Sequence, residues 1–143
     1  MNTIKNLFCV IISMILLISM LTASISAASP MAAPPSAGIQ WVSTDGASAT
    51  LTVIDGLVTI TTGINGKMNI ATRVEVDVKL YRLDNGEWRD CGIAISDAVD
   101  RYAYTNTWQR RVVLKGTYQA VVTAHVYSPY GVDEIVMYPT DIY

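Results

Sequence analysis

The side chains best suited to nucleophilic and metal chemistry are scarce in this chain. It contains two cysteines, Cys9 and Cys91, and one histidine, His125. A cysteine nucleophile needs an activating base, and a structural zinc site draws its four ligands mainly from Cys and His. Cys9 lies in an apolar N-terminal run, which leaves one thiol and one imidazole for the rest of the chain. The sequence therefore predicts no catalytic residue and no metal site, and we expect His125 to be a half-exposed strand residue.

The acidic residues offer no stronger pattern. Asp84, Asn85 and Glu87 lie close together, but the ligand pattern of a calcium loop does not surround them. Asp97 and Asp100 form a pair of the kind that any domain with twelve acidic residues contains. The chain also has no Gly-rich phosphate loop and no G-x-S-x-G nucleophile motif. We therefore expect a protein that has no enzymatic activity and binds no cofactor.

The N-terminal segment has the layout of a secretory signal peptide. A basic residue, Lys5, precedes a mostly aliphatic run at residues 7–21, and small residues follow. A membrane-spanning helix needs about 20 apolar residues, more than this run contains. We expect residues 1–28 to be removed by cleavage near Ala27 or Ala28, giving a secreted protein that is extracellular or loosely associated with the cell wall. The alternative is a leader that is retained as an anchor.

The composition of the remaining chain limits its partners. Without residues 1–28 the chain has 115 residues and a formal net charge of −3. Because nucleic acid is bound by clustered Lys and Arg, we expect no nucleic-acid partner. We also expect no membrane contact after signal cleavage, and no internal disulfide, because Cys91 is then alone. Cys91 is predicted to be a small buried side chain in a monomer, and the alternative is a dimer linked through Cys91.

The elements that must position these side chains read as β-strands. Residues 29–38 hold three prolines among Ala, Ser and Gly and are predicted to be a linker. Residues 39–143 form the predicted domain, in which short β-rich runs alternate with turn residues. The clearest strand is Arg73–Tyr81, where aliphatic and charged residues alternate. This period of two predicts one buried and one solvated face.

Further strands are predicted from runs rich in Thr, Val, Ile and aromatic residues. They lie at Ala49–Ile54, Leu57–Thr62, Glu87–Ile95, Tyr102–Arg111, a run that opens at Lys115, and Asp133–Tyr138. Two tight turns separate them, at Asp55-Gly56 and at Asp84-Asn85-Gly86, the second expected as a type I turn with a Gly bulge. Ser96–Asp100 is predicted to be a connection, with one helical turn capped by Ser96 as the alternative. Seven strands at this spacing predict a β-sandwich.

One short pattern narrows the type of sandwich. Gly116, Tyr118 and Ala120 open the penultimate predicted strand. In immunoglobulin-like domains a tyrosine near the start of strand F bonds back to the preceding corner, two residues before a core cysteine position. Tyr118 fits the tyrosine position and Ala120 the cysteine position. The sequence therefore predicts an all-β fold, a single immunoglobulin-like antiparallel β-sandwich of about seven strands after an N-terminal signal peptide.

The same residues carry a resemblance to a protein family. The hairpin Asp84–Trp88, the corner Gly116–Tyr118 and Glu134 at the last strand resemble small secreted proteins of Gram-positive bacteria, many of them uncharacterised. Those proteins have a leader followed by one immunoglobulin-like β-sandwich domain. The resemblance spans residues 39–138. It implies this fold and an extracellular location, and it implies no catalytic residue.

Three functions remain open from the sequence, because β-sandwiches host many activities. The first is a non-enzymatic interaction module whose partner is an unknown extracellular protein or a cell-wall glycan. The second is a carbohydrate-binding module that uses exposed aromatic residues, drawn from Trp41, Trp88, Trp108 and the tyrosines, with Trp88, Trp108 and Tyr130 as the candidate binding residues. The third is a hydrolase or protease inhibitor that acts through the turn at Tyr127–Gly131.

Overall fold

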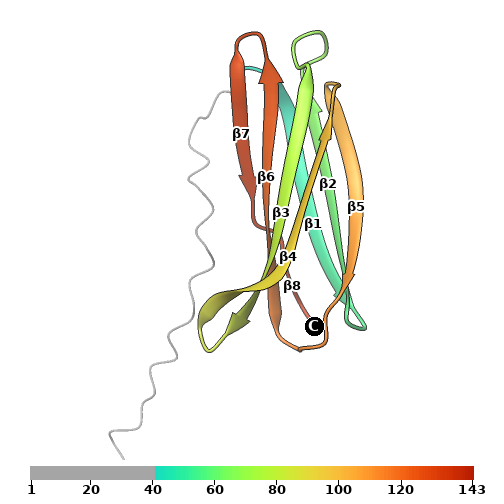
Figure 1. Cartoon of the computed structure of the whole chain (residues 1–143), viewed down its shortest axis with the longest axis vertical. Coiled ribbons are helices and arrows are strands. Elements are labelled where there is room, and N and C mark those ends of the chain that lie inside the picture. The colour runs from blue at the N-terminus through green and yellow to red at the C-terminus, as the bar shows by residue number, and fades with distance from the viewer. Residues whose placement is uncertain (1–40) are drawn as a thin grey trace, which may run out of the picture.

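The computed structural model describes residues 41–143, which form two antiparallel β-sheets packed face to face (Figure 1). No helix occurs in this range, so the prediction of an all-β sandwich is confirmed. No segment of residues 41–143 forms a helix long and apolar enough to cross a membrane. The predicted signal peptide and linker lie outside the described residues.

Eight strands make up the two sheets, one more than the sequence predicted. The three-stranded sheet has the order β1-β2-β5, and the five-stranded sheet has the order β4-β3-β6-β7 with β8 also paired to β6. The strands are β1 (Thr44–Ile54), β2 (Leu57–Gly66), β3 (Arg73–Asp84), β4 (Glu87–Val99), β5 (Ala103–Arg111), β6 (Thr117–Ser128), β7 (Gly131–Met137) and β8 (Thr140–Ile142).

The prediction of a connection or helical turn at Ser96–Asp100 is wrong. Strand β4 continues through this segment to Val99 and stays paired with β3. Asp97 interrupts the apolar residues on the inward side of this strand. In the structure the Asp97 carboxylate accepts a hydrogen bond from the Tyr104 hydroxyl of β5, at 2.8 Å, so a charged residue is accommodated on the inward side.

Both predicted tight turns reverse the chain at the expected residues, but the expected turn type is wrong. Asn85 and Gly86 both have positive φ, 50° and 87°, as do Asp55 and Gly56, 49° and 72°. Two central residues with positive φ define a type I′ turn, whose twist matches that of the flanking strands. The bulge lies further along β4, where the register with β3 shifts beside Gly92.

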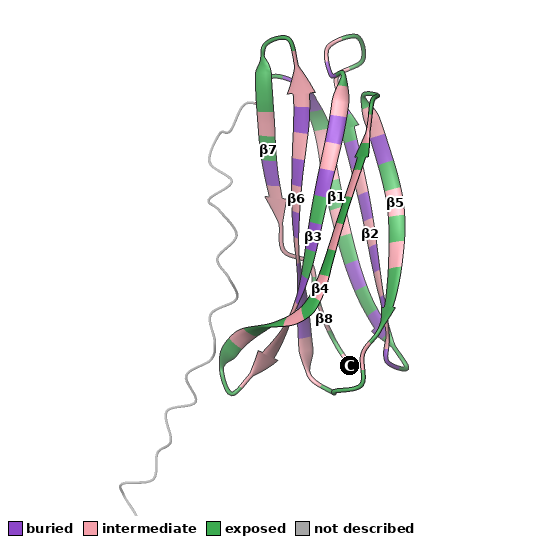
Figure 2. Ribbon diagram, in the orientation of Figure 1, coloured by how far each residue is buried: buried purple, intermediate pink, exposed green. Residues whose placement is uncertain are grey.

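The core lies between the sheets and is built from alternating residues. Figure 2 shows buried bands alternating with more accessible, mostly half-buried bands along β2, β3 and β6. The four aliphatic residues predicted to face inward from β3 are each at most 1% exposed. The other large contributors, from β2 and β6, are Val58, Ile60, Ile64, Tyr118, Val122 and Val126. Burial of these side chains is the main force that holds the sheets together.

Carboxylates also join the two sheets along both open sides of the sandwich. On one side Asp133 of β7 accepts hydrogen bonds from the backbone N–H groups of Val42, at 3.2 Å, and Ser43, at 2.7 Å. On the other side Asp97 of β4 holds Tyr104 of β5. Since the strand ladders of residues 41–143 run only within each sheet, these bonds help to fix how the sheets face each other.

Candidate functional site

The predicted corner forms, and its role is structural. Tyr118 is 1% exposed, and its hydroxyl donates a hydrogen bond to the Leu114 carbonyl oxygen at 2.5 Å. Burial raises the pKa of Tyr118, so the hydroxyl keeps its proton for this bond. Gly116 has a φ of 144°, and Ala120 is fully buried. The corner therefore anchors β6 to the connection from β5.

The three aromatic residues predicted to bind a glycan do not come together. Trp88 is half-buried on the β3–β4 hairpin, and Tyr130 is 74% exposed in the β6–β7 turn at the opposite end (Figure 1). Trp108 is half-buried against the core, with its ring centroid 6.3 Å from that of Tyr104. An aromatic platform would need these rings on one face, and the fold separates them. In the turn at Tyr127–Gly131, which was the candidate inhibitor loop, Tyr130 is exposed to solvent. Tyr127 instead donates a hydrogen bond to Glu75.

The thiol and the imidazole lie apart from each other. Cys91 is half-buried against the core rather than fully buried, and desolvation raises its pKa, which favours the thiol over the reactive thiolate. His125 is half-exposed on β6, as predicted, and its Nε2 lies 3.6 Å from the Glu134 carboxylate. His125 lies on β6, whereas Cys91 lies in β4 near the β3–β4 hairpin. The imidazole and the thiol therefore form no nucleophile–base pair.

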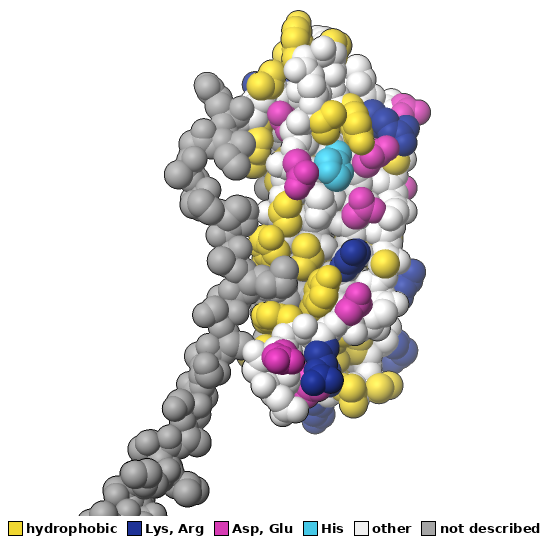
Figure 3. All heavy atoms as spheres, turned by 60° about the vertical axis from the view of Figure 1, so that its left-hand side comes forward, with side chains coloured by type: hydrophobic (Ala, Val, Ile, Leu, Met, Phe, Trp, Pro, Cys, Tyr) yellow, Lys and Arg dark blue, Asp and Glu magenta, His cyan; other side chains and the backbone are white. Residues whose placement is uncertain are grey.

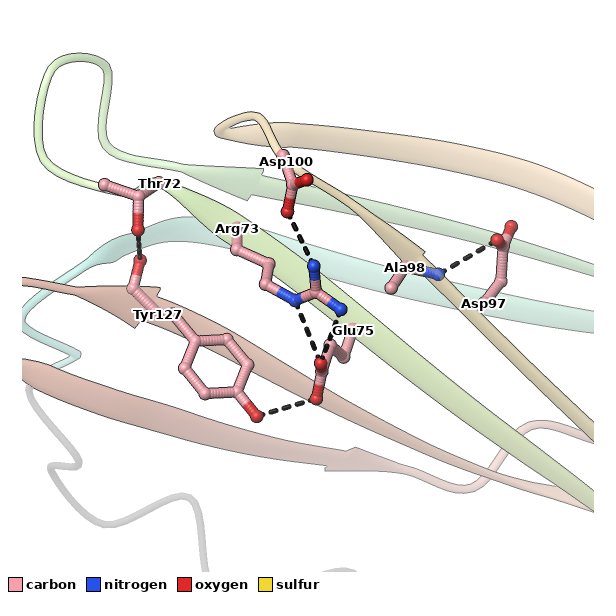
Figure 4. Close-up of polar contacts among 7 residues, drawn as sticks. All are labelled: Thr72, Arg73, Glu75, Asp97, Ala98, Asp100 and Tyr127. Atoms are coloured by element: carbon pink, nitrogen blue, oxygen red, sulfur yellow. Dashed lines mark hydrogen bonds and ion pairs between the residues drawn. The ribbon is translucent and has the colours of Figure 1, made fainter.

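The outer face of the five-stranded sheet carries a polar network (Figure 4). Arg73 pairs with Asp100 at 2.6 Å and with Glu75 at 2.9 Å, and the Tyr127 hydroxyl donates to Glu75 at 2.6 Å. The bond from Tyr127, followed by that from Arg73, lowers the pKa of Glu75. The same contacts raise the pKa of Arg73, first through Asp100, and the pKa of Tyr127 through Glu75. The network is therefore held in its charged form and orders this part of the face.

Two concavities adjoin this network and form one trough, here called the sheet groove. The larger has a volume of about 460 Å³ and the smaller about 440 Å³, and they share Asp77 and Ser96. The register explains the shape, because Asp77 of β3 lies between Ser96 of β4 and Thr123 of β6. The outward residues of β4 beside the groove, Ala94, Ser96 and Ala98, are small, so they leave space beside the longer side chains of β3. The residues that line the groove include Glu75, Asp77, Lys79, Tyr81, Ser96 and Thr123.

The groove offers hydrogen-bonding groups rather than reactive ones. Ser96 donates a hydrogen bond to the Asp77 carboxylate, which orients that carboxylate along the groove floor. Lys79 adds an ammonium group, Thr123 a hydroxyl and Tyr81 an aromatic ring at one end. Within residues 41–143 no group of three or more His, Cys, Asp or Glu side chains is placed to hold a metal ion. This set of groups suits recognition of an uncharged polar ligand.

Sequence reasoning missed the groove, although a signal was present. The prediction used β4 only as the return strand of a hairpin and ended it at Ile95. Ala94, Ser96 and Ala98 alternate with larger residues, and all three point outward from β4. Small outward residues on an edge strand beside charged residues on its neighbour indicate a trough, once the pairing of the two strands is known.

A third concavity, here called the end pocket, lies where the β3–β4 hairpin meets the β5–β6 connection. Its volume is about 440 Å³. The register shift at Leu80/Tyr81 precedes the outward swing of the hairpin away from the sheet in Figure 1, as expected of a β-bulge. Three arginines line the pocket together with acidic and apolar residues, among them Arg82, Asp84, Arg89, Cys91, Ile93, Arg111 and Leu114.

Comparison with protein-family models and with curated proteins finds no match to this chain. The resemblance to small secreted Gram-positive proteins therefore stays a prediction.

Proposed function

We propose that the protein is an exported, non-enzymatic binding module of immunoglobulin-like fold, related to the small secreted proteins of Gram-positive bacteria. The signal-peptide pattern of residues 1–28 supports export. The strand order β1-β2-β5 over β4-β3-β6-β7 and the bond from Tyr118 to Leu114 support the immunoglobulin-like assignment. The residues of the sheet groove lie on the paired strands β3, β4 and β6, which hold them in fixed positions.

The sheet groove supports a glycan chain of the cell wall as the partner. The groove supplies charged and hydroxyl groups, from Asp77, Lys79, Ser96 and Thr123, to bond sugar hydroxyls. Tyr81 offers an aromatic surface at one end, on which the apolar face of a sugar ring can pack. The two adjoining concavities make the site elongated, which suits a chain of sugars better than a single one. The aromatic residues first predicted to bind glycan, Trp88, Trp108 and Tyr130, do not line this groove.

Titration calorimetry with soluble cell-wall polysaccharides tests this function. Asp77→Asn removes the charge at the point shared by the two concavities and keeps the size of the side chain. We expect it to weaken glycan binding by about tenfold, the effect of losing roughly 1.4 kcal/mol of charged hydrogen bonding. Thr107→Val is the control, because Thr107 is an exposed strand residue of the opposite sheet. Unchanged affinity in Asp77→Asn, or no heat with any polysaccharide, would contradict the proposal.

A further inference from the structure

Large apolar side chains are exposed at the end of the sandwich that carries the C-terminus. They are Val113, 89% exposed, Leu114, 54%, Ile54, 69%, and Ile142, 70%. These residues belong to three segments that hydrogen bonds hold together. The Val112 N–H donates to the Gly56 carbonyl at 2.8 Å, and the Tyr143 N–H donates to the Gly116 carbonyl at 3.0 Å. The apolar side chains therefore project from one assembled end, and Figure 3 shows hydrophobic side chains close to basic and acidic ones at the lower end of the molecule.

Basic residues flank the most exposed of these side chains. The β5–β6 connection and its approach read Arg110-Arg111-Val112-Val113-Leu114-Lys115. Within residues 41–143, neither of these arginines nor Lys115 forms a salt bridge. Lys115 instead lies over the ring of Tyr143, 5.9 Å from its centroid. The tip of the connection thus combines two exposed aliphatic residues with three cations that lack a carboxylate partner in the described chain.

The end pocket continues this arrangement toward the β3–β4 hairpin. Arg89 and Arg82 share one carboxylate, that of Asp84, at 3.4 Å and 3.7 Å. Arg111 lines the same pocket from the other side, and Asp90 is the second acidic residue there. Three guanidinium groups against two carboxylates leave the pocket positive. Its apolar lining includes Ile93, Val112 and Leu114, so charged and apolar surfaces adjoin.

We propose that this end docks on the surface of a phospholipid bilayer that carries anionic headgroups. Val113 and Leu114 enter the interface, while Arg110, Arg111 and Lys115 pair with lipid phosphates. The end pocket seats one headgroup phosphate against its arginines. Exposed aliphatic residues and clustered cations are the two contributions that bind peripheral proteins to anionic membranes. The proposal is independent of the sheet groove, and it replaces the expectation of no membrane contact after signal cleavage.

A lipid surface fits this end better than an acidic protein does. The centres of protein interfaces are enriched in Trp, Tyr, Met and Arg and depleted in Lys, and Val and Leu are under-represented among the residues that carry the binding energy. Here the protruding residues are Val, Leu and Ile, and a lysine follows directly. A side chain as exposed as Val113 is buried when it enters the deformable boundary between lipid headgroups and acyl chains. A protein partner would have to supply a cavity that matches its shape. An acidic protein partner is the alternative, and binding of polyglutamate in the absence of vesicle binding would indicate it.

Cosedimentation with vesicles tests the proposal. The protein used is the chain without residues 1–28, which keeps all the strands and core residues of the described range 41–143, so that the apolar leader cannot bind the vesicles. Vesicles of phosphatidylcholine are compared with vesicles that also contain phosphatidylglycerol. We expect binding only to the anionic vesicles, weakened as salt rises. Val113→Ser/Leu114→Ser is expected to lower the partition coefficient about tenfold, and Arg111→Ala about fivefold.

Matched controls lie at the other end of the sandwich. Met68→Ser removes an apolar residue that is 62% exposed in the β2–β3 connection, and Arg101→Ala removes an exposed cation between β4 and β5. Both should leave vesicle binding unchanged, as should Asp77→Asn in the sheet groove. Equal binding to neutral and anionic vesicles, or no binding to anionic vesicles, would overturn the proposal. An unchanged partition coefficient in Val113→Ser/Leu114→Ser and in Arg111→Ala would also overturn it. Binding of soluble glycerol phosphate or polyglutamate without any vesicle binding would also overturn it, because the end would then be an anion or acidic-protein site.

Discussion

Single carboxylates bear much of the organisation of this molecule, and Asp97 shows how. Its Oδ2 accepts hydrogen bonds from the Tyr104 hydroxyl at 2.8 Å and the Asn106 amide at 3.0 Å. These bonds, the one from Tyr104 first, lower the pKa of Asp97. Burial, followed by the bond to Asp97, raises the pKa of Tyr104 to about 12. The two residues therefore hold each other in the charged and the neutral form across the open side between β4 and β5.

Acid should weaken the contact of Asp97 with Tyr104 and Asn106, and the variant Asp97→Ala separates this effect from other effects of pH on stability. Because the folded pKa of Asp97 is lower than its unfolded value, its stabilisation is present at neutral pH and is lost as the pH falls below about 4. We expect urea unfolding to show Asp97→Ala less stable than the parent at pH 7, with the two converging toward pH 3. If the difference in the free energy of unfolding between the two proteins stayed the same from pH 7 to pH 3, the charge of Asp97 would contribute nothing to stability. Glu75, whose pKa is also lowered, adds a further loss shared by both proteins.

Residues differ in how far sequence reasoning reaches them. Tyr118 was recognised because its partner, Leu114, lies four residues away and the pattern is local. The segment Ser96–Asp100 was wrongly predicted to be a connection, because the partners that accommodate Asp97 belong to β5, which only the packed fold brings near. The lining of the sheet groove was missed for the same reason, since Asp77, Ser96 and Thr123 come from three strands.

The strands and turns follow more closely from the sequence. Alternation predicted β3 and its inward residues, and Asp-Gly and Asn-Gly pairs located both tight turns. The turn type was not predictable from those pairs alone, because the same residues suit a type I turn with a bulge and a type I′ turn. The register of the following strand decides between them. In this chain the bulge is displaced to Gly92, which leaves a two-residue turn at the hairpin tip.

The turns at Gly56 and Gly86 have the same backbone conformation but different surroundings, so they show how much the surroundings add to the cost of a side chain. Ala at Gly56 or at Gly86 meets the same penalty for positive φ, about 1–2 kcal/mol. A Cβ at Gly56 would lie 2.8 Å from the Val112 carbonyl oxygen, whereas a Cβ at Gly86 has nothing within 4 Å. We expect chemical denaturation to show Gly56→Ala clearly less stable than Gly86→Ala. Equal losses would mean that the β5–β6 connection moves aside without cost.

At the scale of the whole molecule, the sandwich is closed by side chains rather than by a disulfide within the described residues. Cys91 is the free cysteine of residues 41–143. Strand β1 forms one edge of the three-stranded sheet, and carboxylates of the other sheet hold both its ends. Asp133 of β7 accepts from Ser43 at 2.7 Å, and Asp141 of β8 accepts from Val53 at 2.7 Å. These bonds also occupy edge donors that would otherwise be open to another strand.

Removing these two carboxylates should release β1 while leaving the centre of the molecule intact. Local opening costs less free energy where few bonds hold a segment, and hydrogen exchange reports it. In Asp133→Ala/Asp141→Ala we expect amides of residues 42–54 to exchange faster, with amides of β3 and β6 unchanged. Glu134→Ala is the control, because Glu134 neighbours Asp133 but is exposed and pairs with His125 on β6. Faster exchange throughout the protein would show instead that β1 belongs to a single cooperative unit, in which the carboxylates stabilise the whole sandwich rather than its edge.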